Sequence, residues 1–362
     1  MLCSLEARNF RILEHLEVTP GEEVTVFCGA NGAGKTSILE AIDFLSRGRS
    51  FRSRQLEALL RRGSREVTVT GSVRHAGMRK HLGIRKSAGE RQLHCDRRPV
   101  HSISNHAGIL PVVPVHPDSH RLVQAGARYR RNYLDWSAFH VKPAFLSDWR
   151  QFSRCLRQRN QLLRKGESGR ALQAWTRQIA QAGERIDRTR FDVFEEIRYI
   201  FESFTSKLLP EAGISMSYYR GWPGECRSLQ EALERAADQE RQLRATRWGP
   251  HRADFRLALD GRPAARVASR GQQKLLAASL LLAQIRHLRD HAQRPCIVLL
   301  DDLCAELDRP HAQTLMQAVQ SLGCQTFIST VEPERLDLQG WRQAEMFHVK
   351  QGTCTRLRGQ AA

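Results

Sequence analysis

Long apolar runs are missing from this chain of 362 residues. No stretch approaches the roughly 20 consecutive apolar residues that a membrane-spanning helix needs, so the sequence predicts no membrane span. The first ten residues, MLCSLEARNF, read as a strand with an early acidic residue. They lack the apolar core of a secretory signal peptide. We therefore expect a cytoplasmic protein.

Paired cysteines are also missing. The nine cysteines are scattered, odd in number and without any C-x-x-C pair. This pattern argues against both a disulfide framework and a zinc site. It is typical of buried free thiols in a reducing cytosol. The chain also has no internal repeats and no low-complexity segments.

Acidic residues are few relative to basic ones: 38 against 57, for a net charge of +19. Residues 47–65 hold seven arginines and one acid, and residues 121–165 hold eleven Lys or Arg and two acids. A field of this sign attracts polyanions, and arginine suits forked contacts to phosphate. Nucleic acid is the favoured partner, and an acidic membrane or protein surface is the alternative. The candidate DNA-binding residues are Arg52, Arg54, Arg130 and Arg131.

A complete phosphate loop, G-x-x-x-x-G-K-[ST], is present near the N-terminus. A strand pattern at 23–28 precedes it and a helical pattern at 35–45 follows it. Backbone N–H groups of such a loop turn onto phosphate oxygens, Lys35 charges the β/γ-phosphates, and Thr36 offers a hydroxyl to Mg²⁺. The alternative is a glycine-rich turn that binds no ligand. Such a turn would not need a strand, a loop, a lysine and a helix in this order. The predicted ATP-binding residues are Gly29, Ala30, Asn31, Gly32, Ala33, Gly34, Lys35, Thr36 and Ser37.

The acidic motif that such a loop requires lies more than 260 residues further on, in CIVLLDD (296–302). Asp301 ends an apolar strand pattern, where a carboxylate can hold Mg²⁺. Asp302 is the candidate catalytic carboxylate that polarises the attacking water. The alternative for Asp302 is a simple strand-end cap.

The rest of the chain alternates between sheet and helix patterns. The region before residue 125 predicts three strands over 2–28, an antiparallel meander over 64–100 and a short strand over 110–116. A helix over 126–140 follows. Beyond residue 210 the expected order is strand, helix (228–245), strand, long helix (271–290), strand, helix and strand.

A helical arm is expected between the helix at 126–140 and the region beyond residue 210. Phe145, Trp149, Phe152 and Leu156 are spaced by four, three and four, and similar spacing resumes after the KGESG break at 165–169. Such spacing is typical of two helices packed along a seam. The first, of about 20 residues, would span roughly 30 Å. We expect the aromatic residues to form the seam, although stacking on bases is the alternative.

The long helix begins at VASRGQQK (267–274), which is similar to the LSGGQ signature of ABC-type ATPases. Ser269, Gly271 and Gln272 match, and Arg270 replaces a glycine. The alternative is an ordinary helix start with Ser269 as its N-cap.

Several stretches together resemble the RecF family of bacterial DNA recombination and gap-repair ATPases, over essentially the whole chain. They are NFRIL (9–13), GRSFR (48–52), YRRNYLD (129–135), GPHRADF (249–255), SRGQQK (269–274) and LLDDLCAELD (299–308). The resemblance implies an α/β fold: an SMC-like, ABC-type ATPase head with a mixed sheet, plus a helical lobe with a short antiparallel arm. The expected parts are an N-terminal head part (1–125), a helical lobe (126–245) and a C-terminal head part (246–362).

The resemblance also implies functional roles. Thr36 and Asp301 would hold Mg²⁺, Lys35 and Asp302 would act in catalysis, and the signature residues would cap ATP from a second subunit, with Asp308 at the subunit contact. Expected partners are duplex DNA, single-strand/duplex junctions, a second copy of the chain, and RecR- and RecO-like proteins in loading RecA. His251 of GPHRADF is more readily read as a buried histidine than as a ligand.

Three departures from the ABC pattern predict a slow, switch-like ATPase. No glutamine ends the PVVPVH strand, Ser329-Thr330 replaces the switch histidine, and Asp302 replaces a glutamate. Two other functions remain open. One is an ABC transporter ATP-binding subunit, which should carry that glutamine and histidine and less positive charge. The other is a DNA-binding scaffold with a silent ATP site.

Overall fold

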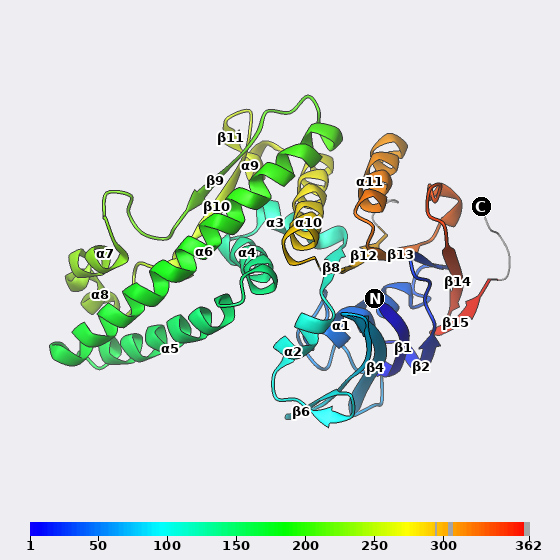
Figure 1. Cartoon of the computed structure of the whole chain (residues 1–362), viewed down its shortest axis with the longest axis horizontal. Coiled ribbons are helices and arrows are strands. Elements are labelled where there is room, and N and C mark those ends of the chain that lie inside the picture. Colours follow the sequence, from blue (N-terminus) through cyan, green and yellow to red (C-terminus); the bar gives the residue numbers. More distant parts are fainter. Residues whose placement is uncertain (294, 303–306, 358–362) are drawn as a thin grey trace. The chain divides into compact units, whose positions relative to one another are not determined.

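The computed structural model describes residues 1–293, 295–302 and 307–357. The chain divides into a head unit, Met1–Ser119 with Gln293–Ala362, and a helical unit, His120–Ala292 (Figure 1). The first division lies close to the expected boundary at 125. The second lies far beyond 245, because the long helix that carries the signature-type loop packs against other helices of the helical unit. Among the described residues, no helix has the length and apolarity to cross a membrane.

A mixed six-stranded sheet organises the head unit, in the order β15-β14-β3-β13-β12-β8. All pairs are parallel except β14 with β15. Every residue of β3, β12 and β13 is buried, as strands covered on both faces require. The strands are β3 (Val24–Cys28), β8 (Val112–Val115), β12 (Ile297–Asp301), β13 (Gln325–Thr330), β14 (Ala344–Lys350) and β15 (Thr353–Arg356).

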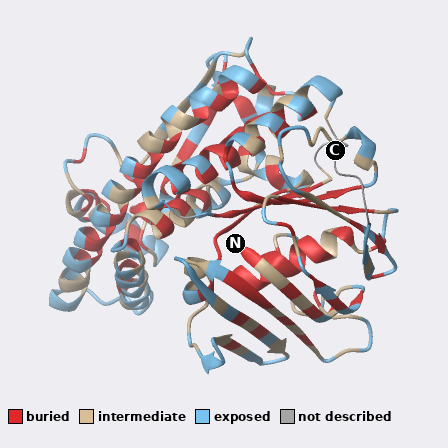
Figure 2. Cartoon of the chain, turned by 45° about the vertical axis from the view of Figure 1, so that its right-hand side comes forward, coloured by how far each residue is buried: buried red, intermediate tan, exposed pale blue. Residues whose placement is uncertain are grey.

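The expected antiparallel meander forms a second sheet, in the order β2-β1-β4-β5-β6-β7. Burial alternates along much of these strands, and Figure 2 shows the alternating bands. The strands are β1 (Leu2–Phe10), β2 (Leu13–Val18), β4 (Glu66–His75), β5 (Met78–Ser87), β6 (Glu90–Cys95) and β7 (Arg98–Pro99). In the described part of the head unit the helices are α1 (Lys35–Arg47), α2 (Ile103–Ile109) and α11 (Arg309–Ser321), with short 3₁₀ turns at Pro117–His120 and Pro333–Arg335.

Helix α1 lies in the core that joins the two sheets. Its apolar residues Ile38, Leu39 and Ile42 are fully buried in one cluster with residues of both sheets. The rings of Phe10 on β1 and Phe44 on α1 lie 5.6 Å apart. This packing fixes the N-terminal end of α1, and with it the phosphate loop, against the parallel sheet.

The helical unit contains the expected antiparallel arm (Figure 1). Helix α5 has 20 residues, as expected, and α6 has 39, which corresponds to about 58 Å of helix. A three-stranded sheet, β11-β10-β9, completes the unit. The elements of the helical unit are, in chain order, α3 (Arg121–Gln124), α4 (Ala127–Val141), α5 (Phe145–Arg164), α6 (Arg170–Leu208), β9 (Ile214–Tyr219), α7 (Leu229–Arg235), α8 (Ala237–Leu243), a 3₁₀ turn (Pro250–Arg252), β10 (Asp254–Leu259), β11 (Arg262–Pro263), α9 (Ala264–Val267) and α10 (Arg270–Ala292).

The seam of the arm differs from the expected one at Trp149. Phe145 and Phe152 are buried, but Trp149 is 43% exposed. The buried stripe continues through Cys155 and Arg159, and Leu156, the other expected seam residue, is only partly buried. Arg159 is tolerated in the seam because its guanidinium binds the buried carboxylate of Glu240 at 2.6 Å and two threonine hydroxyls.

Candidate functional site: a phosphate loop joined to a distant carboxylate

The phosphate loop connects the end of β3 to the start of α1. Its first glycine, Gly29, has φ +146, and a Cβ there would collide with the carbonyl oxygen of Val349 on β14. Gly34 has φ +114, and a Cβ there would lie 3.0 Å from Ile12. Only glycine fits these positions without strain. Strand β14 and the turn between β1 and β2 therefore explain why the motif needs glycine at both ends.

Lys35 closes the loop on itself. Its Nζ donates hydrogen bonds to the carbonyl oxygens of Gly29 at 2.9 Å and Ala30 at 3.0 Å. The residue is only 4% exposed. The ammonium thus lies over the loop, where it is placed to meet an anion that binds the loop's N–H groups.

Asp301 reaches the loop directly. Thr36 Oγ1 donates a 2.7 Å hydrogen bond to Asp301 Oδ1. Parallel pairing makes this possible, because β13 lies between β3 and β12 and the carboxyl ends of all three strands meet at one edge. The structure thus brings together the two residues that the sequence analysis assigned to one metal site. Hydroxyl and carboxylate oxygens are suitable Mg²⁺ ligands.

Ser329 is a site residue whose role sequence reasoning missed. Its hydroxyl donates to Asp301 Oδ1 at 2.7 Å and accepts from the backbone N–H of Asp302 at 3.2 Å. It pairs with Asp301 in the β12–β13 ladder. The sequence showed only that a serine stands where a switch histidine was expected. The strand register, which sequence alone did not give, places its hydroxyl between the two acids.

Asp302 leaves the strand in a different backbone state from Asp301. Its φ is +47, a left-handed conformation that is uncommon for a residue other than glycine and is often found at functional sites. Asp301 is buried, whereas Asp302 is partly exposed. The two adjacent carboxylates therefore have distinct environments, as their distinct predicted roles require.

The signature-type loop begins α10 with a reciprocal pair of hydrogen bonds. Ser269 Oγ accepts from the N–H of Gln272 at 3.2 Å, and Gln272 Oε1 accepts from the N–H of Ser269 at 2.8 Å. This arrangement is a capping box, so Ser269 does cap the helix. Ser269 and Gly271 are nevertheless exposed, so capping leaves them accessible to another molecule. Their predicted role toward ATP stays a prediction.

Asp308 also caps a helix. Its carboxylate accepts from the N–H of His311 at 3.0 Å, at the start of α11, and contacts His311 Nδ1 at 2.6 Å. These hydrogen bonds hold the pKa of Asp308 below its usual range. Residues 303–306 of the LLDDLCAELD stretch lie outside the described residues. The predicted subunit contact at Asp308 stays a prediction.

Two of the four candidate DNA-binding arginines are engaged inside the helical unit. Arg130 pairs with Asp254 through two hydrogen bonds of 2.7 and 3.0 Å and is 13% exposed. Arg131 donates to the carbonyl oxygen of Ala253 at 2.8 Å. These two side chains join YRRNYLD to GPHRADF, and their predicted role in DNA binding stays a prediction. By contrast, Arg52 and Arg54 are exposed.

The YRRNYLD and GPHRADF stretches meet again at Arg190. This buried guanidinium pairs with Asp135 at 2.7 and 3.0 Å and donates to the carbonyl oxygen of Pro250 at 2.6 Å. His251 lies beside it, with Nε2 3.2 Å from the carbonyl oxygen of Thr246. Burial lowers the pKa of His251 to about 4. His251 is a largely buried neutral histidine at pH 7, in agreement with the favoured interpretation.

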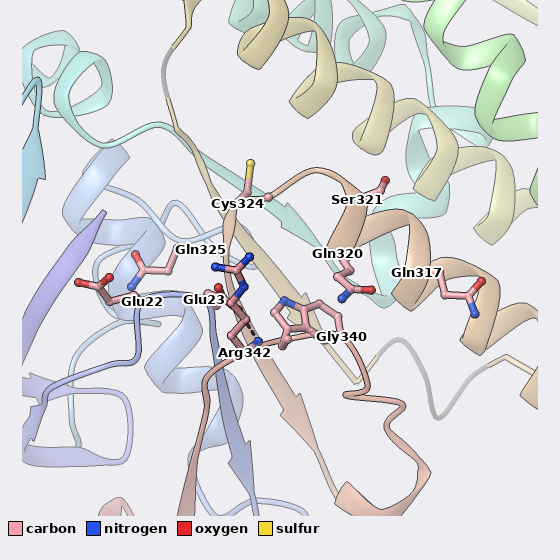
Figure 3. Close-up of a pocket in the computed structure, with 11 residues that line it drawn as sticks. Glu22, Glu23, Gln317, Gln320, Ser321, Cys324, Gln325, Gly340 and Arg342 are labelled. Carbon is pink, nitrogen blue, oxygen red and sulfur yellow. Dashed lines mark hydrogen bonds between the residues drawn. The ribbon is translucent and has the colours of Figure 1, made fainter. Parts of the chain in front are cut away.

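A separate hollow of about 420 Å³ lies at the opposite, amino-terminal edge of the parallel sheet. Figure 3 shows the polar side chains around it, among them Glu22, Gln317 and Arg342. The backbone N–H of Arg342 donates to Glu23 at 2.7 Å. Nucleotides bind parallel α/β sheets at the carboxyl ends of the strands, so this hollow is not the phosphate site.

Comparison with known proteins agrees with the motifs and the fold. The family model described as the RecF/RecN/SMC N terminal domain matches residues 1–355. The chain is 40% identical over 355 residues to the DNA replication and repair protein RecF of Thioalkalivibrio sulfidiphilus, covering 98% of each chain. It is 41% identical over 362 residues to RecF of Pseudomonas fluorescens, again covering 98% of each.

Solved structures show the same fold. The structure titled as the recombination mediator protein RecF with ATP in the RecFOR pathway superposes with a TM-score of 0.86 at 24% identity, covering 98% of this chain and 97% of that one. An Smc head domain from Pyrococcus furiosus gives 0.60 at 14% identity, covering 98% and 95%. The expected α/β head of the ABC-ATPase type is confirmed. The chain belongs to the RecF family of DNA replication and repair proteins.

Proposed function

We propose that this protein is an ATP-dependent DNA-binding protein of recombinational gap repair and replication-fork maintenance. ATP would drive its dimerisation on duplex DNA or on single-strand/duplex junctions, and slow hydrolysis would time its release. The hydrogen bond between Thr36 and Asp301 carries this proposal. It joins the phosphate loop to an acidic strand end within one head unit, which would form one side of a composite ATPase site.

The other half is proposed to come from a second copy. Ser269, Gly271 and Gln272 would contact the γ-phosphate bound to the partner's loop, and Asp308 would lie at the contact. The exposure of the capped signature-type loop supports this. Because each site would need two chains, ATP binding and dimerisation would be coupled events.

Within the site each residue has a separate task. Backbone N–H groups of residues 29–37 and the ammonium of Lys35 would bind the phosphates. Thr36 and Asp301 would hold Mg²⁺, which neutralises charge on the phosphate oxygens when bound. Asp302 would orient the attacking water and accept its proton. Ser329 would keep the Asp301 carboxylate in its rotamer through their 2.7 Å hydrogen bond.

The net charge of +19 supports DNA as the partner. RecR and RecO are proposed partners in loading RecA recombinase, by analogy with the pathway named for the solved relative. A role in DNA repair implies a cytoplasmic location. Family membership removes the ABC transporter alternative. A scaffold with a silent ATP site would bind DNA without hydrolysing ATP.

The rate of ATP hydrolysis against protein concentration tests the proposal. The rate per subunit should rise with protein concentration, because only the dimer has complete sites, and duplex DNA should shift the rise to lower concentration. A rate per subunit that is constant over the whole range would contradict dimerisation. Zero hydrolysis with intact ATP binding would support the silent scaffold.

A further inference from the structure

Two histidines and a glutamate converge where α10 packs against α6, within the helical unit. His287 and His291 lie one turn apart near the end of α10, and Glu196 faces them from α6. The Nε2 atoms of His287 and His291 lie 2.6 and 3.9 Å from Glu196 Oε2. The three ligand atoms all lie within 4.8 Å of one another. We propose that these three side chains bind a divalent transition metal, and that Zn²⁺ fits them best.

The ligand chemistry is that of a three-residue zinc site. Imidazole and carboxylate are ordinary Zn²⁺ ligands, and three protein ligands leave a fourth position for water. Residues four apart share one face of a helix, so His287 and His291 can approach a single ion. Bonds of about 2.0–2.1 Å in a tetrahedron put ligand atoms roughly 3.3 Å apart. Side-chain rotation alone can therefore close the site from its present geometry.

The surroundings favour a cation on one open side. The His287 side chain is fully buried, whereas those of Glu196 and His291 are 27% and 41% exposed. A metal would thus have solvent access for its water ligand. The last turns of α10 also carry the negative end of the helix dipole, which favours positive charge. The neighbouring pair Arg286–Asp290 is satisfied within α10 at 2.8 Å.

The protonation states suit a metal as well. Burial would raise the pKa of Glu196, but hydrogen bonds from His287 and Lys142 hold that pKa below its usual value. Burial lowers the pKa of His287, against the opposing effect of Glu196. An ionised carboxylate and a neutral imidazole are the forms that bind metal.

Two features set an upper bound on the affinity. Lys142 Nζ lies 3.1 Å from Glu196 Oε1 and competes for the carboxylate, so the metal would use Oε2 alone. His287 Nδ1 is buried and meets no hydrogen-bond partner among the described residues. It would carry the ring proton once Nε2 binds metal. A missing partner of this kind costs roughly 10–100-fold in metal affinity, so we expect micromolar rather than tighter binding.

The site would clamp α6, the long helix of the arm, to α10, the helix that begins at the signature-type loop. Such a clamp stabilises the helical unit when metal is present. This role is separate from ATP binding, so its test does not depend on the proposed function.

Zinc binding to the full-length protein tests the proposal, by titration of chelator-stripped protein against a chromophoric zinc chelator. Wild type should bind one Zn²⁺ with micromolar affinity. His291→Ala and Glu196→Gln should each weaken binding tenfold or more, and Lys142→Met should tighten it several-fold. His15→Ala is the matched control, because His15 lies in a second cluster with Glu6 and Glu17 that has no buried member; this variant should bind Zn²⁺ as wild type does.

Cobalt supplies an independent readout. Co²⁺ in this site should give visible bands without the near-ultraviolet thiolate band, because no cysteine is a proposed ligand. The proposal is overturned if His291→Ala binds Zn²⁺ as tightly as wild type, if Lys142→Met leaves affinity unchanged, or if cobalt shows thiolate ligation. Since His291 is near the surface, circular dichroism should show an unchanged fold in His291→Ala.

Discussion

The hydroxyl of Thr36 donates a 2.7 Å hydrogen bond to the carboxylate of Asp301, although 265 positions separate the two residues. Strand β13 lies between the strands that carry the loop and the acid, and pairs in parallel with both. The entire helical unit is inserted in the chain between the two halves of this phosphate site. A long insertion is compatible with one site because the sheet, and not the chain order, sets the neighbours.

Ser329 should matter for metal use. Removing its hydroxyl in Ser329→Ala frees the Asp301 carboxylate to leave its rotamer, and loss of such a supporting hydrogen bond typically costs 10–100-fold in metal affinity. The Mg²⁺ concentration for half-maximal ATP hydrolysis should rise about tenfold. Thr330→Val is the control, since the Thr330 hydroxyl accepts from the Glu332 N–H, whereas it is the Ser329 hydroxyl that donates to Asp301. Equal Mg²⁺ requirements in both variants would remove Ser329 from the site.

Arg54 and Arg130 should behave differently when replaced by alanine. Arg54 is exposed, so Arg54→Ala should weaken DNA binding and reduce the salt slope of log affinity by about 1 if it contacts one phosphate. Arg130→Ala should instead leave Asp254 unpaired and lower the free energy of unfolding by roughly 2–3 kcal/mol. Urea unfolding and DNA binding at several salt concentrations measure the two effects. An Arg130→Ala variant of normal stability but weak DNA binding would contradict this division.

Ser269 should control dimerisation. Ser269→Arg places a long charged side chain in the exposed signature-type loop and should block ATP-dependent dimerisation and hydrolysis while leaving ATP binding by the monomer intact. It also removes a helix cap worth about 1 kcal/mol, so Ser269→Asn, which keeps a capping side chain, is the control. Sedimentation in the presence of ATP measures the dimerisation of both variants. Normal dimerisation of Ser269→Arg would contradict the two-chain site.

His251 should make stability depend on pH. Its pKa is about 4 in the folded protein, below the ordinary value of 6.5, because burial disfavours the charged ring. The unfolded chain therefore binds more protons between these values. Stability is unaffected by His251 above pH 6.5 and is lost as the pH falls, by about 2 kcal/mol at pH 5. His251→Gln should lose correspondingly less stability than wild type between pH 7.5 and 5. Identical losses in urea unfolding would show that His251 is protonated without cost.

Sequence was sufficient where neighbours along the chain determine structure. The phosphate loop, the strands around it and the length of α5 follow from local periodicity and glycine positions. It was insufficient where the partner is remote: Asp254 lies 124 positions from Arg130, so nothing local showed that this arginine is paired. The seam prediction at Leu156 was wrong for a different reason: the buried residue is the adjacent Cys155, and a shift of one position on a helix turns a side chain by about 100°.

The measurement that tests the central claim most directly is the dissociation rate of DNA in the presence of Mg²⁺ and ATP, for wild type, Asp302→Asn and Asp301→Asn. Asn keeps the size of Asp but removes the charge. If Asp302 activates water and Asp301 holds metal, Asp302→Asn should still dimerise, hydrolyse ATP very slowly and release DNA more slowly than wild type. Asp301→Asn should dimerise poorly and fail to retain DNA. Release by Asp302→Asn as fast as by wild type would show that hydrolysis does not time release, and identical behaviour of the two variants would contradict their separate roles.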